Sequence, residues 1–180
     1  LKCAAIDLIS GEKETDFVAL GTELYGHALV AIRANGDAIL WNSEGRKVVG
    51  GRVREAVSSW GIPTTTLNSI GRVTVHGELP GKEAIEKLDN VVAIDSANGI
   101  LAAVDNNGKV HAVFNRGNGV EEPSFLNLLQ SPTPIVDVLA GSRDSIALRP
   151  DGSATLYTRS GEAIRFCENA VQLLLSLIHI

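Results

Sequence analysis

The sequence of 180 residues has no methionine, only two cysteines and few aromatic residues, which make up 4% of the chain. Two cysteines, Cys3 and Cys167, are too few for a disulfide framework, so we expect them to be buried or free thiols. They fit the cytosol and a bacterial exterior equally well and leave the compartment open. The missing methionine leads us to expect that Leu1 is not the native start of the protein.

Long hydrophobic runs are also absent. No apolar run reaches the roughly 18 residues that a membrane-spanning helix requires. The first residues lack the basic segment followed by an apolar segment that is typical of a secretory signal peptide. The sequence therefore predicts no contact with a membrane.

Positive charge is scarce, with 16 Lys and Arg residues against 21 Asp and Glu residues and a net charge of −5. This balance disfavours a phosphate-binding surface, which needs clustered Lys and Arg, so we expect no nucleic-acid partner. Hydrophobic residues make up 44% of the chain and charged residues 21%. These proportions are typical of a globular protein, and the length fits one domain.

A turn glycine recurs along the chain between apolar stretches that alternate as strands do. Three of the four glycines follow Asn or Asp, and such a pair is a strong hairpin signal because both turn residues tolerate positive φ. The recurring glycines are Gly36, Gly71, Gly108 and Gly152, at spacings of 35, 37 and 44 residues. These spacings are typical of propellers and solenoids.

Each repeat predicts one antiparallel sheet of four strands, called a blade here. A leading strand comes before each hairpin, and a weaker fourth strand follows it. The segments 81–88 and 124–130 are candidates for one or two helical turns in the connections. A lone sheet of this kind cannot bury both faces, so the copies must stack. The expected leading strands are 16–21, 54–59, 90–95 and 134–141.

We therefore expect an all-β fold in which stacked four-stranded antiparallel blades form an incomplete, open propeller. Residues 1–180 make one partial domain, with residues 1–15 as the remnant of a preceding blade. Residues 168–180 are either the start of a next blade or, at their end, a sequence artefact. The blade repeats are approximately 16–50, 54–85, 90–126 and 134–166.

The stretch YGHALVAIRANGDAILWN, residues 25–42, resembles the repeat of the regulator of chromosome condensation family. The matching residues are Gly26, His27, Leu29, Ala31, Ile32, Asn35, Gly36 and Trp41. The resemblance extends over about 16–166 and implies a propeller in which His27 and Trp41 have structural roles within the blade. It also implies protein partners, since such propellers bind small GTPases, chromatin or bacterial beta-lactamases.

The sequence departs from the family pattern in several features: no Gly-Gln-Leu-Gly segment follows any copy, the repeats are shorter than is usual for the family, and two departures are changes of residue type. Asn42 replaces the glycine that follows the tryptophan, and the second copy has Thr64, Thr65 and Thr66 in place of aliphatic residues. These departures leave the particular subfamily open.

Signals for catalysis and metal binding are missing. No histidine is spaced with another ligand as a metal site requires, and the glycines of 116–122 lack the Lys and Ser or Thr of a phosphate loop. We therefore expect no catalytic residue, no metal and no cofactor. A propeller lyase or hydrolase remains an alternative, which needs several acidic or histidine residues that converge near the propeller axis.

Binding candidates lie in the loops between the leading strand and the second strand of each blade. In a propeller these loops share one rim, and Trp, Tyr and Arg are enriched in binding hot spots. The alternative for the two aromatic candidates is that they pack between blades. The candidates are Tyr25, Trp60, Ile62, Asn98 and Arg143.

These observations together predict a protein-interaction scaffold that belongs to a larger repeat protein, with an unidentified protein partner. A guanine-nucleotide exchange factor or a chromatin-associated regulator is the alternative that the family resemblance implies.

Overall fold

Strands dominate the computed structural model, in which four antiparallel sheets are accompanied by two short helices. The model describes residues 3–6, 13–22, 28–42, 45–115, 117, 122–141 and 143–170. The prediction of an all-β fold is confirmed.

The first sheet has the strand order β1-β2-β3-β4-β5, which follows the chain. β1 pairs with β2 in the antiparallel sense, with Cys3 opposite Phe17, so β1 is a fifth strand of this sheet. The assignment of residues 1–15 to a preceding blade stays a prediction. The strands are β1 (Cys3–Ile6), β2 (Lys13–Thr22), β3 (Ala28–Arg33), β4 (Ala38–Asn42) and β5 (Gly45–Val49).

The second and third sheets have three strands each, and a short helix follows the third strand of each sheet. The second sheet consists of β6 (Val53–Ser59), β7 (Ile62–Asn68) and β8 (Val73–Val75), and α1 (Lys82–Glu86) follows it. The third consists of β9 (Val91–Ala97), β10 (Ile100–Asp105) and β11 (Val110–Phe114), and α2 (Glu122–Leu129) follows it.

The fourth sheet has the four strands expected of a blade, in the order β12-β13-β14-β15. They are β12 (Asp137–Leu139), β13 (Ser145–Leu148), β14 (Ala154–Tyr157) and β15 (Ala163–Cys167). The two expected helical segments are confirmed as α1 and α2. Because these helices follow the third strands, two of the sheets have three strands where four were expected.

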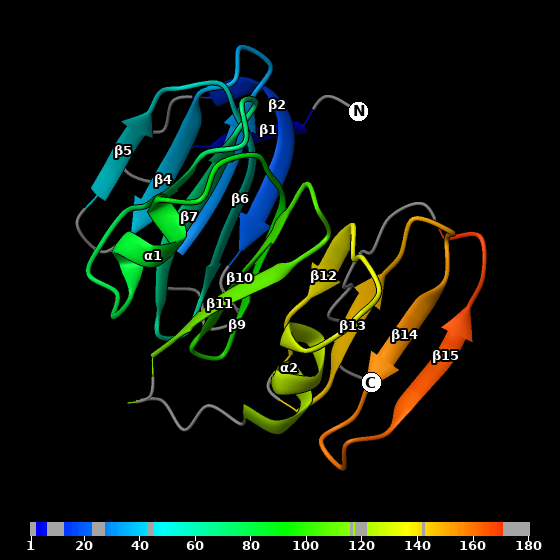
Figure 1. Ribbon diagram of the computed structural model, residues 1–180. Helices are drawn as coiled ribbons and strands as arrows, with labels where there is room; N and C mark the ends of the chain where they lie inside the picture. Colours follow the sequence, from blue (N-terminus) through cyan, green and yellow to red (C-terminus); the bar gives the residue numbers. More distant parts are fainter. Residues whose placement is uncertain are drawn as a thin grey trace.

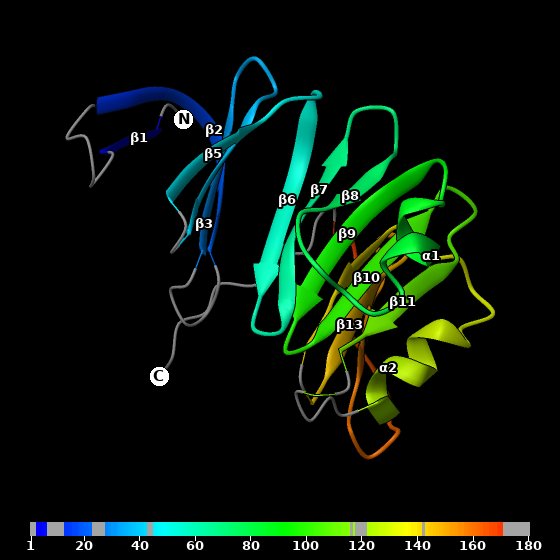
Figure 2. The ribbon, with the colours of Figure 1, turned by 90° about the vertical axis from the view of Figure 1, so that its left-hand side faces the viewer.

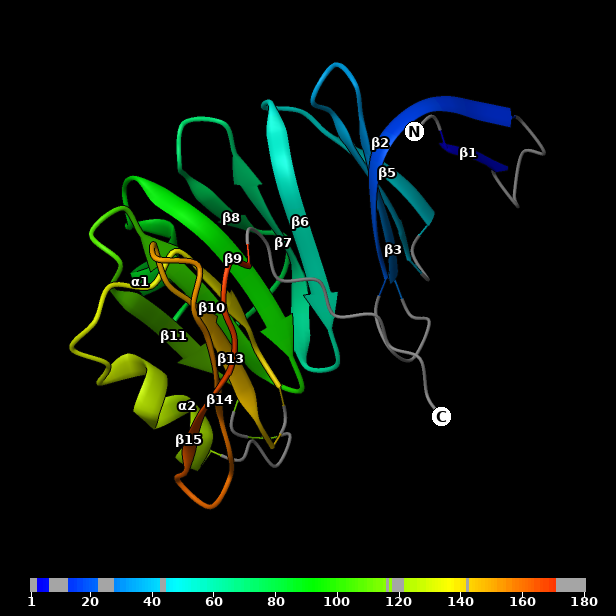
Figure 3. The same cartoon turned by 90° about the vertical axis from the view of Figure 1, so that its right-hand side faces the viewer.

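The four sheets fan out along one open arc (Figure 1). Their leading strands β2, β6, β9 and β12 come next to one another in this order, with contacts from each strand to the next. Figures 2 and 3 show β6 and β9 side by side from opposite directions. The arrangement confirms the expected incomplete propeller.

The core lies between neighbouring sheets, and β10 shows how strand periodicity builds it. Alternate residues of a strand point to opposite faces. Ile100, Ala102 and Val104 pack toward the fourth sheet and α2, whereas Leu101 and Ala103 pack toward the second sheet and α1. All five are fully buried. The unbroken apolar run from Ile100 to Val104 is thus explained by burial on both faces.

The turn glycine of each copy binds the chain that follows through its backbone. Its carbonyl oxygen accepts a hydrogen bond from an amide, which lies at or just before the start of the next leading strand in the first three copies, and we call this the junction hydrogen bond. The acceptors are Gly36, Gly71, Gly108 and Gly152, with φ of 86°, 80°, 78° and 77°. The donors, in the same order, are Val53, Val91, Ile135 and Ala170, at 2.7, 2.9, 2.9 and 2.9 Å.

The last of these contacts continues the pattern beyond the fourth sheet. Ala170 meets Gly152 as Val91 meets Gly71, and the preceding Asn169 has a positive φ of 64°, like Asn90 at 58°. The expectation that 168–180 begins another blade stays a prediction, because 171–180 lie outside the described residues.

The close approach at the junction explains why the turn residue is glycine. A methyl group on Gly108 would lie 2.6 Å from the Cα atom of Pro134 and 2.7 Å from the nitrogen of Ile135. Backbone atoms cannot move aside as the end of a flexible side chain can. The positive φ adds a second reason, since residues with a Cβ atom are strained in that region.

We predict that Gly108→Ala lowers the free energy of unfolding by about 3 kcal/mol, because it combines φ strain with a backbone clash. Gly161→Ala is the matched control. Gly161 has a φ of 87° but no atom within 4 Å of an added methyl group, so only the φ cost of about 1 kcal/mol is expected. Urea denaturation of both variants measures the difference. Equal losses would show that the junction tolerates a side chain.

Candidate functional site

The turns that connect the leading strands to the second strands are joined across two sheets. The amide of Gly99 donates to the carbonyl of Trp60 at 2.8 Å, and the amide of Asn115 donates to the carbonyl of Gly99 at 2.8 Å. The side-chain amide of Asn115 also donates to the carbonyl of Gly61 at 2.8 Å. Asn98 and Gly99 both have positive φ, as a tight hairpin turn requires.

The equivalent loop of the fourth sheet lies between β12 and β13, and its described residues are 140, 141, 143 and 144. Within it, the carboxylate of Asp144 accepts a hydrogen bond from the amide of Arg159 at 3.1 Å. We use the term loop rim for this loop together with the turns 60–61 and 98–99 and Asn115.

The structure places the predicted binding residues in different environments. Trp60 is 41% exposed, so it does not pack between sheets. Asn98 is half-buried, and Arg143 is exposed in the equivalent loop. Tyr25 lies outside the described residues, so its prediction is not tested.

Ile62 is a correction to the loop assignment. It is the first residue of β7 and only 3% exposed, in the core cluster with Leu67 and Val75. The hairpin between β6 and β7 is tighter than expected, so that the strand already begins at this residue and turns its side chain inward. Ile62 therefore cannot present its side chain to a partner.

Among the residues assigned to the repeat itself, Trp41 is half-buried and meets Phe17 edge to face, with ring centroids 6.0 Å apart. The four turn glycines make the junction hydrogen bonds. His27 lies outside the described residues.

Three carboxylates on successive leading strands were not identified from the sequence as site residues. They are Glu55 in β6, Asp95 in β9 and Asp137 in β12. Glu55 Oε2 accepts the amide of Ile94 at 3.3 Å, and Asp95 Oδ2 accepts the amide of Ala140 at 2.5 Å. Each bond joins one sheet to the next. Their signal in the sequence is an acidic residue within a leading strand that also carries buried apolar residues.

Burial determines the protonation of the first two carboxylates. Burial raises the pKa of Glu55 to about 7, against the hydrogen bond from Ile94, and Asp137 adds to this increase while Arg54 opposes it. Burial likewise raises the pKa of Asp95 to about 7, although the amides of Ala140 and Ser96 stabilise its charged form. Both groups therefore change charge near neutral pH.

Arg54 makes a further link between sheets. Its Nη2 atom donates to the carbonyl oxygens of Val91 and Val92, at 3.2 and 2.5 Å. Two neighbouring residues of β6 thus bind the leading strand of the third sheet: Arg54 binds carbonyls, and Glu55 binds an amide.

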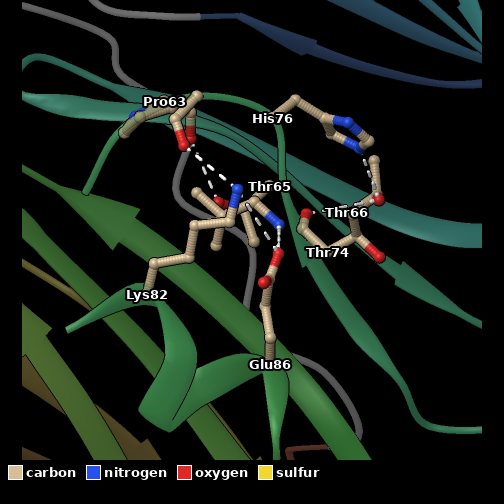
Figure 4. A network of polar contacts seen from close by, with 9 residues as sticks. Pro63, Thr65, Thr66, Thr74, His76, Lys82 and Glu86 are labelled. Carbon is tan, nitrogen blue, oxygen red and sulfur yellow. Dashed lines mark hydrogen bonds and ion pairs between the residues drawn. The ribbon is translucent and has the colours of Figure 1, made fainter. Parts of the chain in front are cut away.

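Thr65 and Thr66 of the second copy make polar contacts in the second sheet (Figure 4). Thr65 Oγ1 donates to the carbonyl of Pro63 at 3.0 Å, and Thr66 Oγ1 lies 3.0 Å from His76 Nε2. Burial lowers the pKa of His76, and the nearby Lys47 and Lys82 lower it further against Glu86. The hydrogen bonds of these hydroxyl groups explain how polar residues are accommodated at buried strand positions.

Glu86 of α1 covers the edge of the second sheet. Its Oε1 atom accepts the amide of Val75 at 2.7 Å, and Lys82 lies 3.8 Å from the same oxygen (Figure 4). The amide of an edge strand would otherwise lack a partner. α1 thus follows β8 where a fourth strand was expected, and it supplies a hydrogen-bond acceptor to the edge of the sheet.

Within the described ranges, no three His, Cys, Asp or Glu side chains are placed to hold a metal ion. Neither of the helices in that part of the chain is long and apolar enough to cross a membrane.

Comparison with known proteins relates the chain to solved propeller structures. No family model matches it, and no curated protein matches it in sequence. Human WBSCR16 has a TM-score of 0.55 at 19% identity, over 74% of this chain and 44% of that chain. Hsv2 of Kluyveromyces lactis has a TM-score of 0.55 at 12% identity, over 86% and 53%.

Prp20p of Saccharomyces cerevisiae has a TM-score of 0.50 at 14% identity, over 78% of this chain and 44% of that chain. Identities this low show the fold alone. The chain spans about half the length of these structures.

The carboxylates predict how stability depends on pH. The pKa of Glu55 rises from 4.5 to about 7 on folding, so the folded state binds more protons than the unfolded state between these values. The stabilising contribution is complete below pH 4.5 and is lost as the pH rises through 7. We expect Glu55→Gln, which keeps an oxygen acceptor, to be more stable than the unaltered chain by roughly 2 kcal/mol at pH 8.

At pH 4.5 the difference between Glu55→Gln and the unaltered chain should largely disappear. Glu83→Gln serves as the control, because Glu83 is an exposed acid that pairs only with Lys87 at 3.5 Å among the described residues. Urea denaturation at both pH values gives the comparison. A constant difference between the two pH values would contradict the prediction.

Proposed function

We propose that this chain is part of a larger propeller protein that serves as a protein-interaction scaffold and binds its partner through the loop rim. The observation that carries the proposal is the exposed indole side chain of Trp60, whose backbone turn is held by hydrogen bonds. Trp60 is 41% exposed, while the turn that holds it is bonded to the neighbouring sheet. Immobilised aromatic residues make effective binding hot spots, because little conformational freedom is lost on binding.

A structural likeness favours a second, narrower candidate. The Prp20p structure was described together with its binding properties to Gsp1p and histones. With the repeat resemblance of 25–42, this supports guanine-nucleotide exchange or chromatin association as an alternative for the whole protein. The net charge of −5 suits a basic protein partner better than nucleic acid.

We further propose that the chain has no catalytic activity of its own. The two buried carboxylates with raised pKa each accept a backbone amide of the next sheet, which suits a structural role. A propeller lyase or hydrolase would need acidic or histidine groups that are free to contact a substrate.

The rim proposal is tested by affinity capture with the full chain and two variants. Trp60→Ala should weaken retention of a specific protein partner at least tenfold, as expected for loss of a hot spot. Ile164→Ala is the matched control, because Ile164 is an exposed apolar residue, at 45%, on the outer strand β15. Quantitative mass spectrometry of the retained proteins gives the readout.

If Trp60→Ala retains every partner of the unaltered chain at the same level, the loop rim is not the binding surface. The exchange alternative is examined separately, by the rate of nucleotide release from small GTPases. Faster release would support it, and unchanged release would leave the general scaffold.

A further inference from the structure

A polar pocket of about 310 Å³ lies between the C-terminal end of α2 and the fourth sheet. α2 packs against β11, β13 and β14 and therefore lies between the third and fourth sheets (Figure 1). Side chains that line the pocket include Asn127, Gln130, Ser131, Thr133, Arg149 and Tyr157. Its lining contains no aspartate or glutamate, and its size is at the lower end of small-molecule sites.

Arg149 is the only charged residue in this lining, and two hydroxyl groups hold its guanidinium in place. Its Nη1 atom donates to Thr155 Oγ1 at 2.5 Å, and its Nη2 atom donates to Tyr157 Oη at 2.7 Å. In the part of the chain that the structure describes, no carboxylate lies within 4 Å of Arg149. Asp151 is near enough to interact electrostatically, but it accepts the amide of Ser153 at 2.8 Å and pairs with Arg165 at 3.9 Å.

The pocket is rich in hydrogen-bond donors. Because the oxygens of Thr155 and Tyr157 accept bonds from Arg149, their hydroxyl hydrogens remain available to donate. Tyr157 lines the pocket, and the side-chain amides of Asn127 and Gln130 add further N–H donors. Oriented donors around a guanidinium suit an oxyanion.

We propose that this pocket binds a small ligand that carries an oxyanion, either a carboxylate or a phosphate, through Arg149 and Tyr157. The site is separate from the loop rim, since its residues come from α2, the following loop and the fourth sheet. It therefore does not depend on the proposed scaffold function.

Titration of the full chain with acetate and with inorganic phosphate tests the proposal by NMR. The guanidinium signal of Arg149 and the backbone signals of the lining residues should shift and saturate with at least one of the two anions. The response to each anion distinguishes a carboxylate ligand from a phosphate ligand. Arg149→Gln should weaken the binding at least tenfold, because it removes a charge-assisted contact.

Arg72→Gln provides the matched control. Arg72 is an exposed arginine between β7 and β8, outside the pocket lining, and its loss should leave the affinity unchanged. Tyr157→Phe keeps the packed ring and removes only the hydroxyl, so it tests the site even where Arg149→Gln impairs folding. It should weaken binding severalfold, with an unchanged circular dichroism spectrum.

Two results would overturn the proposal. One is the absence of any saturable shift with either anion up to about 20 mM, a range that detects even weak binding. The other is equal affinity in the unaltered chain and in Tyr157→Phe or a folded Arg149→Gln variant, which would place the bound ion elsewhere.

Discussion

The junction hydrogen bond is the interaction on which the rest of this structure depends. At Gly36, Gly71 and Gly108 it joins the glycine carbonyl to an amide at or just before the next leading strand, and at Gly152 it joins the carbonyl to the amide of Ala170. The contact brings two backbones so close that no side chain fits at Gly108 without a clash. Sheets connected in this way lie side by side, and their apolar faces then exclude water from the space between them.

Ionisable groups on the leading strands bridge the same pairs of sheets. Glu55 and Asp95 each accept an amide of the following sheet, and Arg54 donates to two carbonyls. Burying a carboxylate costs free energy, which is why the pKa of both acids is raised to about 7. The same groups supply hydrogen-bond partners to backbone amides and carbonyls between the sheets. Cohesion between sheets is therefore coupled to pH.

The helices make the second and third copies differ from the regular repeat. α1 covers the edge of a three-stranded sheet through Glu86, and α2 fills the space between two sheets and forms one wall of the Arg149 pocket. The loop rim, by contrast, keeps the tight turns of the repeat and exposes Trp60. The regular frame of sheets holds these variable parts at fixed positions.

Local patterns in the sequence were sufficient to predict the leading strands, the turn glycines and both helices, but not the number of strands in the second and third sheets. Strand alternation and positive φ at a turn depend on neighbouring residues only. The same reasoning wrongly placed Ile62 in a loop. Where β7 begins depends on the packing of Ile62 with Leu67 and Val75 in the core, which local patterns do not show. Glu55 and Asp95 meet amides 39 and 45 residues away, and Arg149 lines a pocket whose other wall is α2. Only the stacking of the sheets brings such groups together, and so the tertiary structure alone decided which polar residues form sites.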